Sequence, residues 1–374
     1  MRKDKFYLIL LFLIHSGLTY SSGIDKLKPG FDPAEYRQLL EISHRQSDTP
    51  WTSANVSLPY PEGCKMVYRS DSAGLDNRWD LWIRKDSVGI ISIRGTTLSA
   101  NSWAEDFYSS MVPAKGSIIT GNKNVFIYKL AESEKANVHT GWLLGLAFLS
   151  ESITEKINEY HSNGINEFLI MGHSQGGAIA YLLTSYLHYL DKGRIPDDVK
   201  FKTYCSAPPK PGNLFYSYDF DFISRGGWAL RVSNTEDWVP QCPLSVQTVN
   251  DFSTVNPYSE KESLVVKMNF IEKIIFDYIV GRLNSNLNDC KDLLNEYFGK
   301  MIYDHSIKKY LPDFPEPIYT GDFYFYPCGV PVVLMKQNGY DEFIKTETKI
   351  PELFKNHMIP AYFFLLDKIY FGNQ

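Results

Sequence analysis

The segment LIMGHSQGGAIAYLL, residues 169–183, constrains the fold of this chain more strongly than any other stretch. It begins with a short apolar run that is typical of a buried strand, and it ends with apolar residues at helical spacing. Ser174 lies between the two, at the centre of GHSQG. This pattern predicts a turn so tight that it strains the serine backbone and lifts the hydroxyl above the end of a sheet. We expect side chains at Gly172 and Gly176 to clash with neighbouring backbone there.

Such a corner makes Ser174 a candidate nucleophile. The helix that follows would direct its free N–H groups and the positive end of its dipole at the hydroxyl. The backbone N–H of Gln175 is therefore a candidate oxyanion donor. A glycine-rich turn with an exposed serine can have the same sequence, and that alternative stays open at this point.

Strand and helix patterns alternate along most of the chain. A helix is expected at 33–44, and amphipathic helices are expected at 139–160 and after Ser174. Alternating or continuous apolar runs predict a hairpin and then further strands, at 65–71, 78–85, 87–95, 165–172, 200–208, 228–237 and 323–339. This order predicts the α/β class, with a mostly parallel central sheet flanked by helices.

The alternation is interrupted between about residues 245 and 315. Helical periodicity covers 262–282 and 288–302 instead, before β patterns return. We interpret this stretch as a helical insertion that lies over the sheet, within one domain of residues 24–374.

The N-terminal residues 1–23 have the features of a secretory signal peptide. Basic residues precede an apolar run from Phe6 to Ile14, and small and polar residues follow. Cleavage is expected near residues 20–23, which would make the protein secreted or extracytoplasmic. A retained membrane anchor is the alternative. No later segment is long and apolar enough to predict a transmembrane helix.

Charge and cysteine content limit the possible partners. The formal net charge is −5 and no block of Lys and Arg is present, so nucleic-acid binding has little support. Five cysteines are spread singly, without a C-x-x-C pair or metal-ligand spacing, so neither a metal nor another cofactor is predicted. In an exported protein they could form one or two disulfides, although most are expected to be small buried residues.

A nucleophilic serine needs a base, and the base needs a carboxylate that orients it. After an elbow of this kind the expected chain order is Ser, Asp, His. Asp237 follows a predicted strand and is favoured over its neighbour Glu236. His357 follows the last β pattern and is favoured as the base, whereas His305 lies inside the helical insertion and is the alternative.

With these residues assembled, the chain resembles the fungal-type, or class 3, lipases of the α/β-hydrolase superfamily. The resemblance covers roughly residues 65–365 outside the insertion. It rests on six segments in the family's order: ISIRGTTLSANSWAEDF, VHTGW, GHSQGGAIAYLL, TYCSAPPKPGN, RVSNTEDWVP and HMIPAYFFLL.

The resemblance implies two further roles. Thr96 takes the position of the first oxyanion donor, through its backbone N–H. The segment 97–113, with Trp103 and Phe107, takes the position of a lid that covers the site in water and moves away at a lipid surface. Its own residues predict only a short helix, so a fixed surface helix is the alternative.

The expected function is a secreted serine carboxylic-ester hydrolase, namely a triacylglycerol lipase or lipid esterase that acts on an acyl-ester or lipid substrate at a lipid–water interface. The long interval between Asp237 and His357 departs from the family pattern. Some relatives also keep this fold without hydrolysis. A non-catalytic protein that binds a lipid or partner is therefore the first alternative, and a serine peptidase on the same fold is the second.

Overall fold

The computed structural model describes residues 26–46, 58–121, 124–253, 256, 258, 269–348 and 350–372. The predicted signal peptide lies outside these residues.

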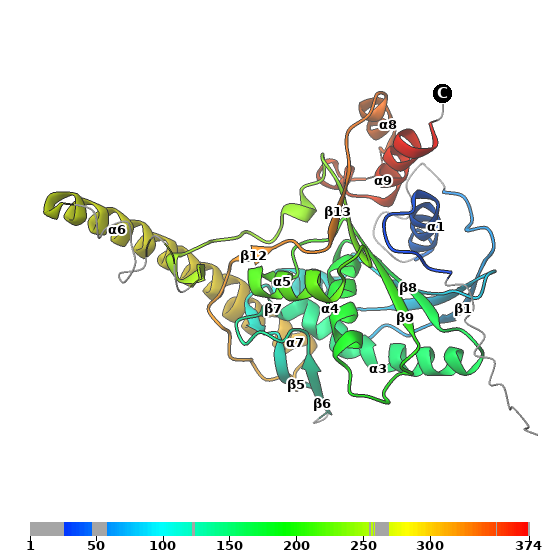
Figure 1. Ribbon diagram of the computed structural model, residues 1–374, viewed down its shortest axis with the longest axis horizontal. Coiled ribbons are helices and arrows are strands. Elements are labelled where there is room, and N and C mark those ends of the chain that lie inside the picture. The colour runs from blue at the N-terminus through cyan, green and yellow to red at the C-terminus, as the bar shows by residue number, and fades with distance from the viewer. Residues whose placement is uncertain are drawn as a thin grey trace, which may run out of the picture.

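A seven-stranded sheet forms the centre of the molecule (Figure 1). The first two strands of the sheet are antiparallel to their neighbours, and the remaining five strands are parallel. The predicted hairpin and the mostly parallel sheet are thus both present. In spatial order the strands are β1 (Cys64–Arg69), β2 (Trp79–Arg84), β3 (Gly89–Ile93), β8 (Glu167–His173), β9 (Lys200–Ser206), β11 (Ala229–Asn234) and β13 (Val330–Leu334).

Alternate residues of the central strands enter two different hydrophobic cores, as expected for strands buried on both faces. Ile170 of β8 packs in one core with helices α2 (Ala100–Phe107), α3 (Thr140–Ser162), α4 (Gln175–Tyr189) and α5 (Leu214–Ile223). Leu169 and Met171 pack in the other core, with α1 (Pro33–Ser43), α8 (Tyr340–Thr346) and α9 (Ile359–Leu366). The sheet is therefore covered by helices on both faces.

Two small sheets lie beside the central one. Residues of four short strands form the first of them, with the order β12 (Phe325–Tyr326), β10 (Gly212–Asn213), β7 (Asn137–His139) and β4 (Met111–Pro113). The second is a hairpin of β5 (Lys115–Gly121) and β6 (Asn124–Lys129). Apart from β12, these strands lie in stretches where no strand was expected. The two- and three-residue strands give too little periodicity to detect, whereas β5 and β6, of seven and six residues, were missed although they are long enough.

The insertion is helical, as expected, but its longest helix extends away from the body instead of lying over the sheet (Figure 1). This helix, α6 (Phe270–Asn295), continues into π-helical turns at 296–301 and 303–307 and then into α7 (Lys308–Tyr310). Only the later part packs on the body, where Leu294, Tyr303 and Ile307 are buried. Seven apolar side chains of its first turns are at least half exposed, namely Phe270, Ile271, Ile274, Ile275, Tyr278, Ile279 and Leu283. Within the described residues, no packing surface therefore draws that end onto the sheet.

Candidate active site

Ser174 lies at the corner between β8 and α4, with the strained backbone that its sequence predicts. Its φ of 61° and ψ of −130° are unfavourable for a side chain other than glycine. A Cβ atom at Gly172 would overlap the carbonyl oxygen of Gly176, and one at Gly176 would overlap that of Ile93. The turn is therefore closed by packing that only glycines at both flanking positions allow.

Gln175 is the first residue of α4, so its backbone N–H belongs to the unpaired first turn of that helix. The end of β3 packs closely against this corner at Gly95. A Cβ atom at that position would lie only 2.8 Å from the carbonyl oxygen of His173. Thr96 follows directly and lines the same pocket as Ser174 and Gln175. The two candidate oxyanion donors thus come from adjacent strand ends.

Asp237 and His357 meet although 120 residues separate them. The Nδ1 atom of His357 lies 2.8 Å from Oδ2 of Asp237, and both side chains are almost completely buried. The hydroxyl of Tyr362 donates a second hydrogen bond, of 2.7 Å, to the same carboxylate oxygen. His357 lines the pocket that Ser174 also lines.

The two alternative residues lie elsewhere. Glu236 is exposed, and its carboxylate is 3.9 Å from the ammonium group of Lys336. His305 is exposed on the insertion, where its Nδ1 is 3.0 Å from the carbonyl oxygen of Met301. It does not line the pocket of Ser174. The geometry therefore brings together Ser174, Asp237 and His357 but not the alternatives.

The pocket around these residues has a volume of about 260 Å³ and mostly apolar walls. Aromatic side chains from six separate parts of the chain contribute to the walls, namely Trp103, Phe107, Trp142, Trp238, Phe298, Phe323 and Phe354. The ring of Phe354 lies 5.7 Å from that of Trp103 and 5.8 Å from that of Trp238. Such a lining suits a hydrocarbon chain better than a charged ligand.

Two acidic residues of α2 hold this helix to the body. Asp106 accepts hydrogen bonds from the hydroxyl of Thr96, at 2.8 Å, and from the indole N–H of Trp142, at 3.1 Å. Burial raises the pKa of Asp106 to about 6, although both hydrogen bonds act in the opposite direction. The neighbouring Glu105 is fully buried and accepts a 2.5 Å hydrogen bond from Asn77. Burial raises the pKa of Glu105 well above its usual value.

His173, the residue before the candidate nucleophile, connects the elbow to the loop of the candidate base. Its Nε2 is 2.7 Å from the backbone carbonyl oxygen of His357, so this nitrogen carries the proton and donates. Its Nδ1 therefore accepts from the hydroxyl of Ser206, at 2.9 Å. Burial lowers the pKa of His173 to about 3, which keeps the ring neutral.

Sequence reasoning did not assign roles to Asp106, His173 or Tyr362. Each lies inside a quoted segment, respectively WAEDF, GHSQG and HMIPAY. Their contacts depend on residues 10 to 184 positions away, so the segments indicated the right neighbourhood but not the partners.

Part of the chain is similar to known proteins. A family model described as Lipase (class 3) matches residues 90–247, a range that contains Thr96, Ser174 and Asp237. This part of the chain is similar to the class 3 lipase family. The mostly parallel central sheet, flanked by helices, is the architecture that this resemblance predicts. The matched range ends before His357 and the insertion, so the position of His357 is known only from the geometry described above.

Two curated class 3 lipase relatives are similar over part of their length. The secreted mono- and diacylglycerol lipase 1 of Fusarium solani is 30% identical over 108 residues, which cover 28% of this chain and 29% of the relative. The triacylglycerol lipase OBL1 of Ricinus communis is 28% identical over 186 residues, which cover 41% of this chain and 34% of the relative. The chain thus spans about a third of the length of the curated relatives it matches.

Solved lipase structures have a lower similarity. A triacylglycerol lipase from Penicillium expansum is 13% identical, with 63% of this chain and 79% of that chain covered and a TM-score of 0.40. The Rhizomucor miehei lipase propeptide complex is 19% identical, with 56% and 62% covered and a TM-score of 0.38. With TM-scores this low, these two structures add nothing to the assignment of the site.

Proposed function

We propose that this protein is a secreted serine carboxylic-ester hydrolase that acts on acylglycerols or other lipid esters. The observation that carries the proposal is the meeting, in one apolar pocket, of a strained serine and a histidine that is hydrogen-bonded to a buried aspartate. The family match and the names of the curated relatives support the lipid-ester class of substrate. Secretion rests on the predicted signal peptide of residues 1–23. Within the described residues, no helix is both long and apolar enough to cross a membrane.

In the proposed reaction, Nδ1 of His357 donates to Asp237, which leaves Nε2 able to accept a proton. Ser174 attacks the ester carbonyl carbon while this nitrogen takes the hydroxyl proton. The proton then goes to the departing alcohol, and an acyl-enzyme forms on Ser174. Water, activated by the same histidine, hydrolyses the acyl-enzyme and releases the acid.

Negative charge develops on the carbonyl oxygen in both steps. The backbone N–H groups of Thr96 and Gln175 are the proposed donors to this oxygen, and one such donor typically lowers the barrier by about 3 kcal/mol. The hydrogen bond from Thr96 to Asp106 holds the first donor's residue in place before substrate arrives. The mechanism uses no metal or organic cofactor.

The test is hydrolysis of p-nitrophenyl esters of graded acyl length by the purified mature protein and by Ser174→Ala. We expect activity in the wild type, with longer acyl chains preferred, and its loss in the variant. Circular dichroism spectra that match would show that both proteins are folded. If both folded proteins were equally inactive on all chain lengths, the hydrolase proposal would be wrong and a lipid-binding role without catalysis would take its place.

A further inference from the structure

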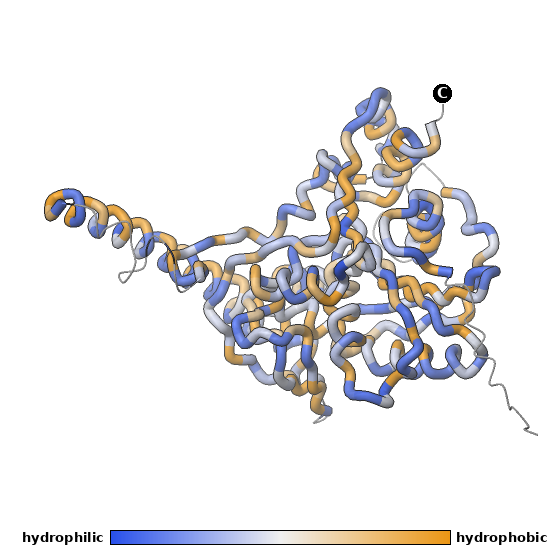
Figure 2. The backbone as a smooth tube through the Cα atoms, viewed as in Figure 1, coloured by the Kyte–Doolittle hydropathy of each residue, from blue (hydrophilic) through white to orange (hydrophobic). Residues whose placement is uncertain are grey.

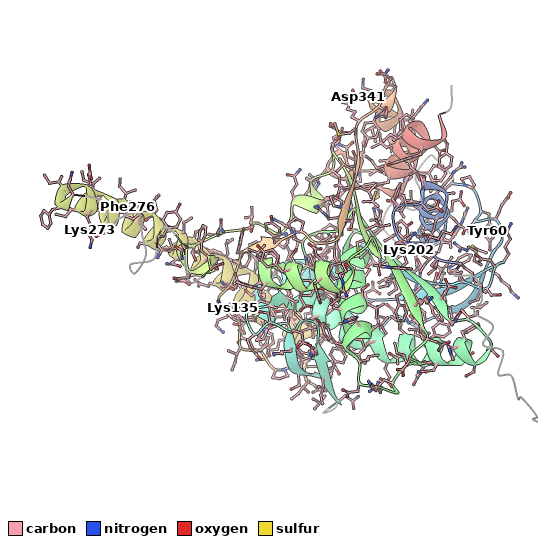
Figure 3. The ribbon with its side chains drawn as sticks, viewed as in Figure 1. Tyr60, Lys135, Lys202, Lys273, Phe276 and Asp341 are labelled. Atoms are coloured by element: carbon pink, nitrogen blue, oxygen red, sulfur yellow. The ribbon has the colours of Figure 1, made fainter. Side chains whose placement is uncertain are left out.

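The first turns of α6 expose an unusual amount of apolar surface. Phe270 is 79% exposed, Ile271 is 68% exposed and Tyr278 is 68% exposed. Figure 2 shows that apolar residues dominate this projecting end of the helix, and Figure 3 shows the part of α6 around Lys273 and Phe276 standing clear of the body. Residues 270–283 extend for roughly 20 Å at 1.5 Å per residue. Exposed apolar surface of this kind marks an interaction site.

The apolar residues of this end surround most of the helix. At 100° per residue, they are spread over roughly 280° of the circumference, and Glu272 and Arg282, near the two ends of the segment, lie between them. A narrow strip with Lys273, Asp277 and Asn284 completes the circle. A single partner helix covers a stripe only about 100° wide, so it would leave most of this surface in water. A surrounding apolar medium, such as the acyl region of a lipid layer, covers the whole arc.

The second half of α6 and the turn that follows it are joined to the wall of the pocket. Lys291 forms a 3.6 Å ion pair with Asp251, and Asn284 accepts a 3.2 Å hydrogen bond from the backbone N–H of Val249. Phe298, in the π-helical turn that continues α6, lines the pocket and packs 6.2 Å from the ring of Phe323. The position of the helix is therefore coupled to the position of the pocket.

The charges on this end cancel. Glu272 and Asp277 are balanced by Lys273 and Arg282 within residues 270–283. No excess of basic side chains is present to attract anionic headgroups, in contrast to helices that bind membranes through charge. Association with lipid would depend on burial of apolar side chains and would not require anionic lipid.

We propose that residues 270–283 of α6 form a lipid-surface anchor, which inserts into an uncharged lipid layer and holds the pocket next to it. The inference rests on the proposed function, because it identifies the surface on which the substrate of that pocket is presented. The strip with Lys273 and Asp277 faces water, and the apolar arc enters the acyl region.

The experiment is flotation of the full mature protein with phosphatidylcholine vesicles in a density gradient. The test variant is Ile275→Ser with Ile279→Ser, and the matched control is Lys273→Ser with Asp277→Ser. Both pairs lie four residues apart on α6, all four side chains are exposed, and neither pair changes the net charge. We expect the wild type and the control to float, and the test variant to partition at least tenfold less. Added salt at 1 M should leave wild-type flotation within about twofold.

Hydrolysis of soluble p-nitrophenyl acetate separates this inference from the proposed function. The test variant should keep wild-type rates on the soluble ester and lose rate on an emulsified long-chain acylglycerol. Flotation of the wild type together with inactivity on every ester would support the anchor and contradict the hydrolase. The anchor would be contradicted if the wild type stayed at the bottom of the gradient, or if the test variant floated equally well. Sedimentation showing a wild-type dimer that the test variant cannot form, without flotation, would assign the surface to a second copy and also overturn the proposal.

Discussion

Helices α2 and α6 both contribute to the region of the pocket, but they are held in opposite ways. α2 is only eight residues long, yet its inner side is tied to the body by Glu105 and Asp106. α6 has 26 residues, and within the described part of the chain its contacts with the body come from its second half, from Asn284 onward. Side chains of the short helix form hydrogen bonds with the body of the protein, whereas the long helix presents apolar side chains to solvent.

The difference matches what each helix would have to do. Stabilising charge on a reacting oxygen requires groups that are fixed before the substrate binds, and Asp106 fixes Thr96. Contact with a lipid layer requires apolar area and no fixed partner. The hydrogen bonds of α2 also favour a fixed surface helix over a moving lid for segment 97–113. Moving this segment would break the hydrogen bonds of the buried Glu105 and the partly buried Asp106.

The largest effect is expected at the carboxylate that orients the base. Asp237→Asn would place an amide opposite Nδ1 of His357 and favour the wrong tautomer. We expect kcat on soluble esters to fall by roughly 10³- to 10⁴-fold, because the carboxylate of a serine triad holds the histidine in the tautomer that accepts the proton. Steady-state kinetics on p-nitrophenyl butyrate would measure this change.

The matched control for that variant is Glu236→Gln, at the adjacent exposed position. Its kcat should stay within about twofold of wild type, because surface substitutions away from special contacts have small effects. Equal losses in the two variants would show that the loop as a whole, and not Asp237, supports activity.

The second effect concerns the free energy of unfolding. It tests whether the packing of α2 desolvates the carboxylate of Asp106 and so destabilises the protein when this group is charged. Because the folded pKa of Asp106, about 6, lies above that of an unfolded aspartate, the folded state binds this proton more tightly. The resulting stability is present in full below about pH 4 and is lost as pH rises through 6. The side chain introduced by Asp106→Asn does not titrate. When the pH is raised from 4 to 7, the free energy of unfolding should therefore fall by roughly 1–3 kcal/mol less in this variant than in wild type.

Urea unfolding at pH 4, 5, 6 and 7 would measure this difference. Glu105→Gln should change the pH dependence in the same direction, since burial also raises the pKa of Glu105. The same pH dependence in wild type and Asp106→Asn would mean that Asp106 is not desolvated by the packing of α2.

A smaller effect is expected at the link between the elbow and the loop of the base. His173→Phe keeps the ring but removes the hydrogen bond to the backbone carbonyl of His357. We expect kcat to fall about tenfold with little change in KM, because a buried carbonyl without its partner costs about 1–3 kcal/mol and the loop would shift to reach one. Tyr36→Phe is the control: it removes the hydroxyl that lies 2.6 Å from Ser206 but leaves both bonds of His173 in place. A similar fall in kcat in both variants would remove any special role of His173.

The sequence was sufficient to predict the sheet and the nucleophile corner for a physical reason. The strand of residues 165–172, the glycines around Ser174 and the helix after it are local signals, and all of them lie within residues 165–189. Asp237 and His357 were chosen by chain order and by position after strands, and the structure brings these two into hydrogen-bonding distance. Whether they act in catalysis remains a prediction.

The long-range contacts were beyond a single sequence. The bond of His173 to His357 joins residues 184 positions apart, and nothing in GHSQG names its partner. The course of α6 was also mispredicted as lying over the sheet. Its periodicity predicts a helix, but apolar residues around nearly the whole circumference do not indicate which face packs, and here most of the first turns do not pack on the body.

The smallest effect is expected from the exposed end of α6, and it completes the contrast with α2. Ile275→Ser with Ile279→Ser removes two side chains that are about half exposed, so it should change the free energy of unfolding by no more than about 1 kcal/mol in the absence of lipid. The same type of change at a buried apolar position, such as Leu146→Ser in α3, should cost at least 3 kcal/mol. Urea unfolding at pH 7 would compare the two. A large loss in the α6 variant would mean that these isoleucines are covered within the protein itself, and the surface available for lipid would then be smaller than the structure indicates.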